Sequence, residues 1–239
     1  MSAVDIEALQ RWIGRTETRS DELCAAPVAA LSACLDYEHP RALIGDSLQP
    51  CWHWLYFQAA VAASGLGVDG HARRGGFLPP VSLPQRMWAG SRLRFVALLT
   101  VGKAVRRVST IASITHKQGR NGELVFVTVR HQIFQGETLA IEEEQDLVYR
   151  EPGPANVVPL PRPAPAVAQW SREMRPDTVL LFRYSALTFN SHRIHYDRDY
   201  ATREEGYASL VVQGPLTATL LLDLLHREIP EAEVAEFEF

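Results

Sequence analysis

Cysteine is scarce in this sequence of 239 residues, and long runs of one charge are missing. The three cysteines, Cys24, Cys34 and Cys51, include no C-x-x-C pair, so the sequence favours free thiols in a reducing compartment over a cysteine-based metal site. The 24 basic and 28 acidic residues give a net charge of −4, with no sizeable block of one sign. This balance argues against nucleic acid or an anionic membrane surface as the main partner.

A membrane-spanning segment and a secretory signal are also missing. The longest apolar stretch, residues 216–225, is too short to cross a bilayer and is interrupted by Asp223. The first residues lack the basic start and the apolar run of a signal peptide. These absences predict a soluble protein of the cytoplasm.

The patterns that are present predict an α+β fold. Residues 1–36 have a helical and then a loop-rich pattern, and residues 51–64 are apolar on nearly every face, which predicts a buried helix. A loop rich in Gly, Pro and Arg spans residues 65–84. Four runs of β-branched and apolar residues follow, separated by glycine-containing turns, and they predict an antiparallel meander wrapped around the helix.

A proline-rich segment, residues 151–167, separates this first half from a second one. Because proline cannot donate ladder hydrogen bonds, an extended linker is predicted between a domain of residues 1–150 and a domain of residues 168–239. In the second domain, residues 178–187 predict a strand. A second apolar helix is expected from Gly214, since the proline that follows it is common in the first turn of a helix.

The second domain has only one further strand candidate, in residues 233–239, against four in the first. So small a sheet would leave an apolar helix uncovered. We expect either that the sequence stops before its second sheet is complete, which we favour, or that a partner chain completes the sheet. A homodimer is compatible with this pattern.

The residues suited to chemistry lie between Asn190 and Gly214. Asn190, His192, His195 and Asp197 fall within eight residues. His195 can act as a general acid or base because its ordinary pKa lies near neutral pH, and Asn190 can orient water or a substrate oxygen. The backbone N–H of Gly214, at a helix N-terminus, can stabilise negative charge that develops on a carbonyl oxygen.

Plainer interpretations stay open for several of these residues. His192 fits a local hydrogen bond as well as a share in catalysis, Asn190 fits a structural amide, and Asp197 fits a helix cap. A metal site built from His192, His195 and Asp197 lacks a further cluster of ligands, so no metal is predicted.

The same segment resembles the MaoC-like (R)-specific enoyl-CoA hydratase/dehydratase family. His195 and Asp197 match the H-x-D of the family signature, Gly206 and Tyr207 match its G-(F/Y) element, and Gly214 matches the glycine that opens the central helix. The resemblance implies a double hot-dog fold, in which each sheet wraps around a central helix. It also implies that His195 is the catalytic histidine and that the Gly214 N–H binds the thioester oxygen.

Two departures from the signature point to a subgroup. Asn190 replaces the family's catalytic aspartate, and Gln213 replaces the histidine before the helix glycine. The stretches S-A-L-T-F-N-S-H-R-I-H-Y-D and V-V-Q-G-P-L resemble mesaconyl-CoA and itaconyl-CoA hydratases and the mitochondrial 3-hydroxyacyl-thioester dehydratases.

This likeness implies reversible hydration of a short branched C4-dicarboxylyl-CoA, in the cytoplasm or the mitochondrial matrix. Coenzyme A would be part of the substrate, and no cofactor would be required. The first half would be a degenerate hot dog that shapes the acyl pocket.

Substrate contacts are expected from His192, Arg193 and Gln213, with Arg193 the nearest partner in sequence for an acyl carboxylate. The aromatic cluster in residues 52–57 is expected in the core.

Two rival functions stay open because the amide of Asn190 cannot take a proton as a carboxylate does: an acyl-CoA thioesterase of the same fold and a non-catalytic acyl-CoA binding module. Further basic residues that could contact CoA are Arg73, Arg74, Arg86 and Arg183.

Overall fold

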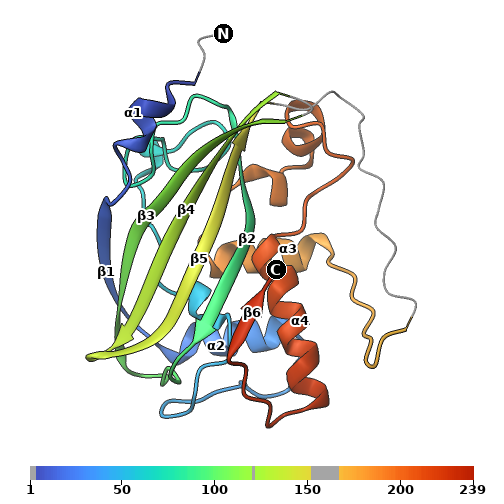
Figure 1. The fold of residues 1–239 in the computed structure, drawn as a ribbon. Helices are drawn as coiled ribbons and strands as arrows, with labels where there is room; N and C mark the ends of the chain where they lie inside the picture. The colour runs from blue at the N-terminus through green and yellow to red at the C-terminus, as the bar shows by residue number, and fades with distance from the viewer. Residues whose placement is uncertain (1–3, 120–121, 152–166) are drawn as a thin grey trace.

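The computed structural model describes residues 4–119, 122–151 and 167–239. Its main layer is an antiparallel sheet of six strands in the order β1-β3-β4-β5-β2-β6 (Figure 1). The predicted α+β class and its four long strands, β2 to β5, are confirmed. The strands are β1 (Thr16–Glu22), β2 (Gln85–Phe95), β3 (Ala104–Gly119), β4 (Gly122–Gln135), β5 (Thr138–Arg150) and β6 (Glu236–Glu238).

The strand order differs from the predicted meander at β2. This strand pairs with β5 and not with β3, so only β3, β4 and β5 are hairpin-connected neighbours. Residues 96–103, between β2 and β3, are held by other parts of the chain: the N–H groups of Val96 and Ala97 donate to the carbonyl of Ala140, and Thr100 bridges to Ser47. A connection with these anchors crosses the sheet and does not form a hairpin.

The sequence pattern does not predict β1. Its residues, T-E-T-R-S-D-E, alternate between half-buried and exposed positions and include no large apolar side chain. β1 pairs with β3 at the edge of the sheet, where polar and charged strands are common. A polar edge strand lacks the apolar alternation by which strands are recognised.

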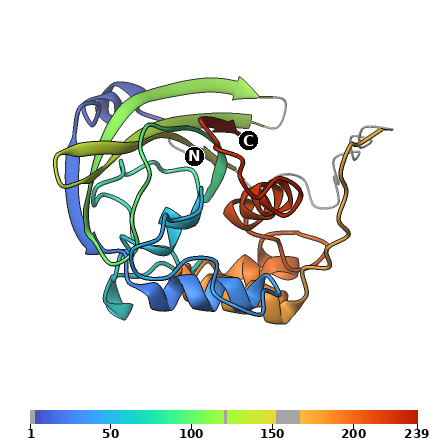
Figure 2. The same ribbon diagram turned by 90° about the horizontal axis from the view of Figure 1, so that it is seen from below.

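The buried helix of the first half is α2 (Ala25–Cys34), and the predicted helix over residues 51–64 is wrong. Val28 and Leu31 of α2 are almost fully buried. In the view from below, α2 lies alongside α3 (Thr178–Leu187) under the sheet (Figure 2). A further short helix, α1 (Ile6–Gln10), precedes β1.

Residues 51–65 form two short 3-10 turns, Trp52–Leu55 and Ala63–Gly65, and no α-helix. Cys51 and Phe57, on either side of the first turn, have left-handed φ angles of 68° and 59°, and an α-helix cannot continue through such residues. Residues 58–64 are exposed. Apolar composition alone therefore misleads here, because it determines neither the backbone conformation nor, for residues 58–64, the burial.

The predicted strand over residues 178–187 is wrong as well, because this segment is α3. The Asp177 carboxylate accepts a hydrogen bond of 2.9 Å from the N–H of Leu180 and caps the helix N-terminus. Leu181, Tyr184 and Ser185 are buried, which is the i, i+3, i+4 face of a helix. The cap and this spacing outweigh the strand propensity of the segment.

The predicted second apolar helix is confirmed as α4 (Gly214–Glu228). Asp223 is a buried carboxylate on α4 that accepts hydrogen bonds from Tyr37 at 2.6 Å, Arg172 at 2.8 Å and Arg227 at 2.8 Å. Asp223 therefore ties α4 to the first half of the chain and to the segment before α3. Among the described residues, no helix has the length and hydropathy needed to span a bilayer.

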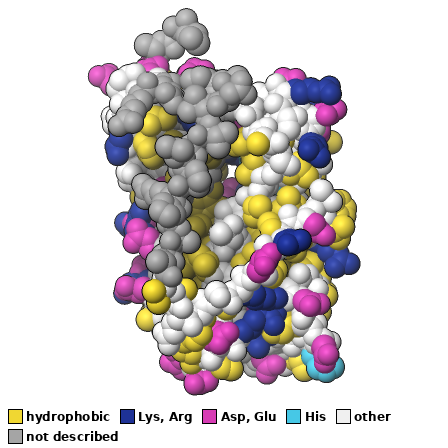
Figure 3. All heavy atoms as spheres, turned by 90° about the vertical axis from the view of Figure 1, so that its right-hand side faces the viewer, with side chains coloured by type: hydrophobic (Ala, Val, Ile, Leu, Met, Phe, Trp, Pro, Cys, Tyr) yellow, Lys and Arg dark blue, Asp and Glu magenta, His cyan; other side chains and the backbone are white. Residues whose placement is uncertain are grey.

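The single strand of the second half, β6, adds to the sheet of the first half by pairing Phe237 with Leu93 of β2. Beyond β6, residues 167–239 contain only helices and loops. Figure 3 shows hydrophobic side chains among charged ones on the face that carries α4, and Val179, Phe182 and Leu221 are among the exposed residues of the two long helices. The incompleteness of the second hot dog stays a prediction, as does the domain boundary, since residues 152–166 of the linker lie outside the described residues.

Candidate active site

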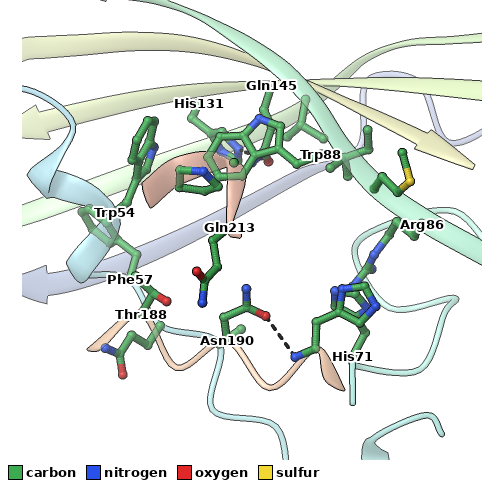
Figure 4. Close-up of a pocket in the computed structure, with 18 of the residues that line it drawn as sticks. Trp54, Phe57, His71, Arg86, Trp88, His131, Gln145, Thr188, Asn190 and Gln213 are labelled. Atoms are coloured by element: carbon green, nitrogen blue, oxygen red, sulfur yellow. Dashed lines mark hydrogen bonds between the residues drawn. The ribbon is translucent and has the colours of Figure 1, made fainter. Parts of the chain in front are cut away.

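A cavity of about 700 Å³ lies between the sheet of the first half and the segment that leads into α4 (Figure 4). Both halves of the chain contribute to its lining. Five of the six predicted site residues meet here although they are spread over 25 positions of sequence, namely Asn190, His192, His195, Gln213 and Gly214.

His195 closes a short 3-10 helix, Arg193–His195, and is 7% exposed. Its Nδ1 lies 2.7 Å from the carbonyl oxygen of Val211. Because a carbonyl only accepts, Nδ1 carries the proton, and Nε2 is left as a bare acceptor. Burial lowers the pKa of His195 to about 4, against the opposing effect of the Val211 carbonyl. His195 is therefore a neutral base at neutral pH.

Asn190 is held by the backbone around it. Phe189, just before it, has a left-handed φ of 51°, which turns the chain sharply after α3. The Asn190 Oδ1 accepts a hydrogen bond of 3.1 Å from the N–H of His192, shown dashed in Figure 4. Its Nδ2 makes no hydrogen bond within the described part of the chain and is a free donor at the cavity.

Gly214 is the first residue of α4, so its N–H has no partner within the helix. A Cβ added to Gly214 would meet nothing within 4 Å, which shows that the space beside its backbone is open. Gln213, next to it, is 1% exposed, and its Nε2 donates to the Leu181 carbonyl and to Ser185 Oγ, each at 2.9 Å. These two hydrogen bonds hold Gln213, the residue before α4, against α3.

His71, from the loop of the first half, also lines the cavity, and the sequence did not single it out. Its Nδ1 lies 2.8 Å from Asp69 Oδ2, and its ring centroid lies 4.1 Å from that of His192, which is 5.5 Å from that of His195. Burial lowers the pKa of His71 to about 4, although Asp69 opposes the shift. Burial would raise the pKa of Asp69, but His71 outweighs it and holds that pKa well below its ordinary value.

The loop that carries His71 is docked onto the Asn190–Asp197 segment by its backbone. The N–H of Arg193 donates to the Asp69 carbonyl at 2.9 Å, and Ser191 Oγ donates to the Gly70 carbonyl. Gly70 has a φ of 87°, and a Cβ there would lie 1.9 Å from the Ser191 oxygen. Only glycine fits so close an approach. The sequence Asp69-Gly70-His71 indicates a role at the site only once the contact between Gly70 and Ser191 is known.

The structure does not bring the sixth predicted residue, Arg193, to the cavity lining. Its guanidinium pairs with Asp197 at 2.7 Å, donates to the Val68 carbonyl at 3.0 Å and lies over the ring of Tyr200. Asp197 also accepts from the N–H of Tyr200 at 3.1 Å, which agrees with the capping interpretation. Both residues build the loop and do not face the pocket.

A buried polar cluster forms the sheet side of the cavity. Glu143, on β5 and 3% exposed, accepts hydrogen bonds from Trp54 at 3.1 Å and Ser91 at 2.8 Å and lies 3.2 Å from His53 Nε2. Burial would raise the pKa of Glu143, but His53 and the other donors lower it to about 2. Sequence reasoning missed this cluster because its members come from separate strands and loops.

The aromatic cluster of residues 52–57 is divided between two roles. Trp52, Tyr56 and Phe57 pack in the core as predicted. Tyr56 and Phe57 also line the cavity, together with the half-buried Trp54. Trp54 and Trp88 meet edge to face at 5.2 Å between ring centroids.

One group in the described residues has the spacing of metal ligands, and it differs from the one that the sequence suggested. Ligand atoms of Asp69, His71 and His192 lie within 4.8 Å of one another. The hydrogen bond between Asp69 and His71 accounts for the closest of these contacts. Asp197 takes no part, since it is bound to Arg193.

The sequence profile of the hydroxyacyl-thioester dehydratase type 2 family matches residues 51–239. This range holds all the lining residues of the cavity named above. The chain belongs to this family. A mesaconyl-C(4)-CoA hydratase from Chloroflexus aurantiacus is 51% identical over 94% of this chain and 79% of its own length. The mitochondrial hydroxyacyl-thioester dehydratase type 2 of Schizosaccharomyces pombe is 30% identical over 92% of this chain and 83% of its own length.

For this hydroxyacyl-thioester dehydratase type 2 homologue, solved structures support the fold. A Mycobacterium tuberculosis protein with a double hot-dog fold matches with a TM-score of 0.55 and 14% identity, over 95% of this chain and 78% of that one. The predicted family and the predicted double hot-dog architecture are confirmed.

Proposed function

We propose that this family member catalyses the reversible addition of water to the Cα–Cβ double bond of an enoyl-CoA. The preferred substrate is a short branched C4-dicarboxylyl-CoA such as mesaconyl-CoA or itaconyl-CoA. One observation carries the proposal: the free Nε2 of a neutral, buried His195 shares a cavity with the unpaired N–H of Gly214. The likeness to a mesaconyl-C(4)-CoA hydratase supports the choice of substrate.

In the proposed reaction, the thioester oxygen accepts a hydrogen bond from the Gly214 N–H at the positive end of α4. His195 Nε2 removes a proton from water while the water oxygen bonds to Cβ, and the electron pair of the double bond moves toward the thioester as an enolate. The protonated His195 then returns its proton to Cα. Its low pKa favours this return, because a buried imidazolium is a strong acid.

Asn190 takes the place of a carboxylate in this scheme. Its free Nδ2 donates to the attacking water or to the 3-hydroxyl group of the product, while its Oδ1 stays bound to the backbone. An amide orients the oxygen but cannot remove a proton, so His195 carries both proton transfers. The thioester itself makes Cα acidic, so the proposed chemistry needs no metal or redox cofactor, and coenzyme A enters as part of the substrate.

The compartment and assembly belong to the same proposal. The protein would act where CoA thioesters are held, in the cytoplasm or the mitochondrial matrix. A homodimer remains compatible with it.

The test is to incubate the purified protein with mesaconyl-CoA and with crotonyl-CoA. Loss of enoyl absorbance without release of thiol is expected. His195→Gln should lower kcat by about 100- to 10,000-fold, the usual contribution of a general acid–base group, with little change in melting temperature. His39→Gln, at an exposed histidine, is the matched control and should keep full activity.

Two outcomes favour the rival functions. Stoichiometric thiol release indicates a thioesterase, and tight binding without turnover, unaffected by His195→Gln, indicates a binding module. Full hydratase activity of His195→Gln would contradict the assigned base.

A further inference from the structure

Two arginines line the cavity, and neither forms an ion pair within the described part of the chain. One of them, Arg86 on β2, lies in the same lining as His195 and Gly214. Arg193, beside the site, is by contrast paired with Asp197. A half-buried guanidinium without a counter-charge is unusual, because burial of an unpaired charge is unfavourable.

The other basic residues around the site are already occupied. Arg193 is paired with Asp197 outside the cavity. Arg74 donates its guanidinium hydrogens to the backbone carbonyls of Val81, Leu83 and Pro84. Neither group is available to a ligand without breaking these contacts.

Arg107 is the second arginine of the cavity lining, and its charge is compensated by acids. Burial lowers its pKa, while Glu143 and Glu17 act in the opposite direction. These two glutamates are the only carboxylates among the described residues that line the cavity. Both carboxylates of the lining therefore act on Arg107, and neither of them pairs with Arg86.

The surroundings of Arg86 place it next to the chemistry. Figure 4 shows Arg86 beside His71, and its positive charge contributes to the lowered pKa of that histidine. From His71 the row of imidazoles continues to His192 and His195 at 4.1 Å and 5.5 Å between successive ring centroids. At neutral pH His71 and His195 are uncharged, since both pKa values are lowered to about 4.

The neighbouring strand places a polar group beside this arginine. Tyr149 of β5 is the cross-strand partner of Arg86; burial raises the pKa of its hydroxyl, and the adjacent Arg86 guanidinium acts in the opposite direction. Apolar side chains, among them Met87 and Trp88, complete this part of the wall. A charged group surrounded in this way favours one kind of occupant, a ligand anion that excludes water.

We propose that Arg86 binds the free carboxylate of a dicarboxylyl acyl group and thereby selects dicarboxylyl thioesters over simple enoyl thioesters. This inference rests on the proposed hydratase function. Guanidinium and carboxylate are both planar and can form two parallel hydrogen bonds, which fixes the acyl group as well as attracting it. An acyl group without a carboxylate leaves the Arg86 charge unpaired in a closed site.

The experiment compares kcat/KM for mesaconyl-CoA and crotonyl-CoA in the wild type and in Arg86→Gln. We expect a loss of about 30-fold or more with mesaconyl-CoA, the range seen when one partner of a buried charge pair is removed, and less than about threefold with crotonyl-CoA. Arg86→Lys keeps the charge but not the paired hydrogen bonds, and should lie between the two. Arg92→Gln is the matched control, because Arg92 is on the same strand but pairs with Asp146 on the surface.

Each other outcome decides against the assignment. Equal losses on both substrates, with an unchanged melting temperature, would mean that Arg86 serves the CoA part or the general structure. A wild type that hydrates crotonyl-CoA but discriminates against mesaconyl-CoA would overturn the Arg86 proposal and leave the hydratase function standing. A wild type that hydrates neither would overturn the proposed function itself.

Discussion

At the scale of single residues, the site combines one imidazole with one backbone amide. The Val211 carbonyl fixes the tautomer of His195, and burial keeps its ring neutral. The Gly214 N–H has no partner within the helix because Gly214 is the first residue of α4. Neither of the roles proposed for them needs a charged side chain at the reacting atoms, which is consistent with the proposed use of an amide at position 190.

Gly214→Ala tests the role of that amide. The added methyl meets no protein atom within 4 Å, and alanine is a better helix former than glycine, so we expect unchanged or slightly higher stability. The methyl would occupy the open space beside the N–H, where the thioester oxygen is proposed to bind. We expect kcat/KM to fall by about 100-fold, the scale for loss of one oxyanion donor, measured by the decrease of enoyl absorbance.

Gly76→Ala is the control for this substitution, because Gly76 also has open space around its Cβ position. It should leave activity unchanged. Retention of full activity by Gly214→Ala would remove Gly214 from the proposed mechanism.

The sequence predicted much of the site at this scale. Asn190, His192, His195, Gln213 and Gly214 are close in sequence or bracket one helix start, so local pattern sufficed for them. Their supports were not predictable, because the side chains that complete the cavity come from loops and strands far away in sequence. These supports include His71, Trp88, His131 and Glu143.

At the scale of elements, the docked loop of residues 67–71 decides how the two halves meet. Its backbone bonds to Arg193 and Ser191 hold His71 against His192. The loop can approach this closely because Gly70 has no side chain, so its Cα can lie against the Ser191 carbonyl. The amino-acid composition does not reveal such contacts, so the sequence predicts this segment only as a loop.

Gly70→Ala should separate the loop from the site. The Cβ would overlap the Ser191 oxygen at 1.9 Å, and the residue has a φ of 87°, so the loop must shift. We expect kcat to fall by at least about tenfold, because displacement of supporting groups by about 1 Å is costly to catalysis. Gly75→Ala is the matched control: its φ of 89° imposes the same strain, but its Cβ would meet only Pro80 at 3.9 Å.

Steady-state kinetics with thermal melts on both variants measure this difference. An equal loss of activity in the two would assign the effect to backbone strain and contradict the docking role.

The helices show how far local sequence patterns predict secondary structure in this protein. α4 is apolar, has proline in its first turn and is found as expected. α2 and α3 are missed, since each is a short segment of ten residues whose composition suits a strand or loop equally well. The cap at Asp177 is a local signal that identifies α3 in hindsight.

At the scale of the whole molecule, several histidines are held in the neutral form by partial or full burial. The pKa values of His71, His131 and His195 are each lowered to about 4, with burial as the first cause. In the unfolded chain these rings titrate near 6.5. Between these two values the unfolded state binds more protons than the folded state, so acid favours unfolding.

We therefore expect the free energy of unfolding to be constant above about pH 7 and to fall, on the order of a few kcal/mol, as pH drops from 6.5 toward 4. Urea unfolding at pH 7.5, 6.0 and 5.0 measures it. Most carboxylates contribute only at lower pH, so the interval from 6.5 to 5 reports the histidines.

His131→Gln should flatten this dependence, because it removes one of the three rings whose pKa is lowered. His39→Gln, at an exposed position, should leave the slope unchanged. A urea midpoint that does not move between pH 7.5 and pH 5.0 would contradict the assignment.

The pair of indoles on the cavity wall has a practical consequence. Of the five tryptophans, Trp54 and Trp88 lie edge to face where the acyl group is proposed to bind, and Trp54 Nε1 donates to Glu143. Indole emission changes colour and intensity with the polarity and hydration of its surroundings. The protein thus contains its own optical reporter, and occupancy of the pocket can be followed by intrinsic fluorescence without a label.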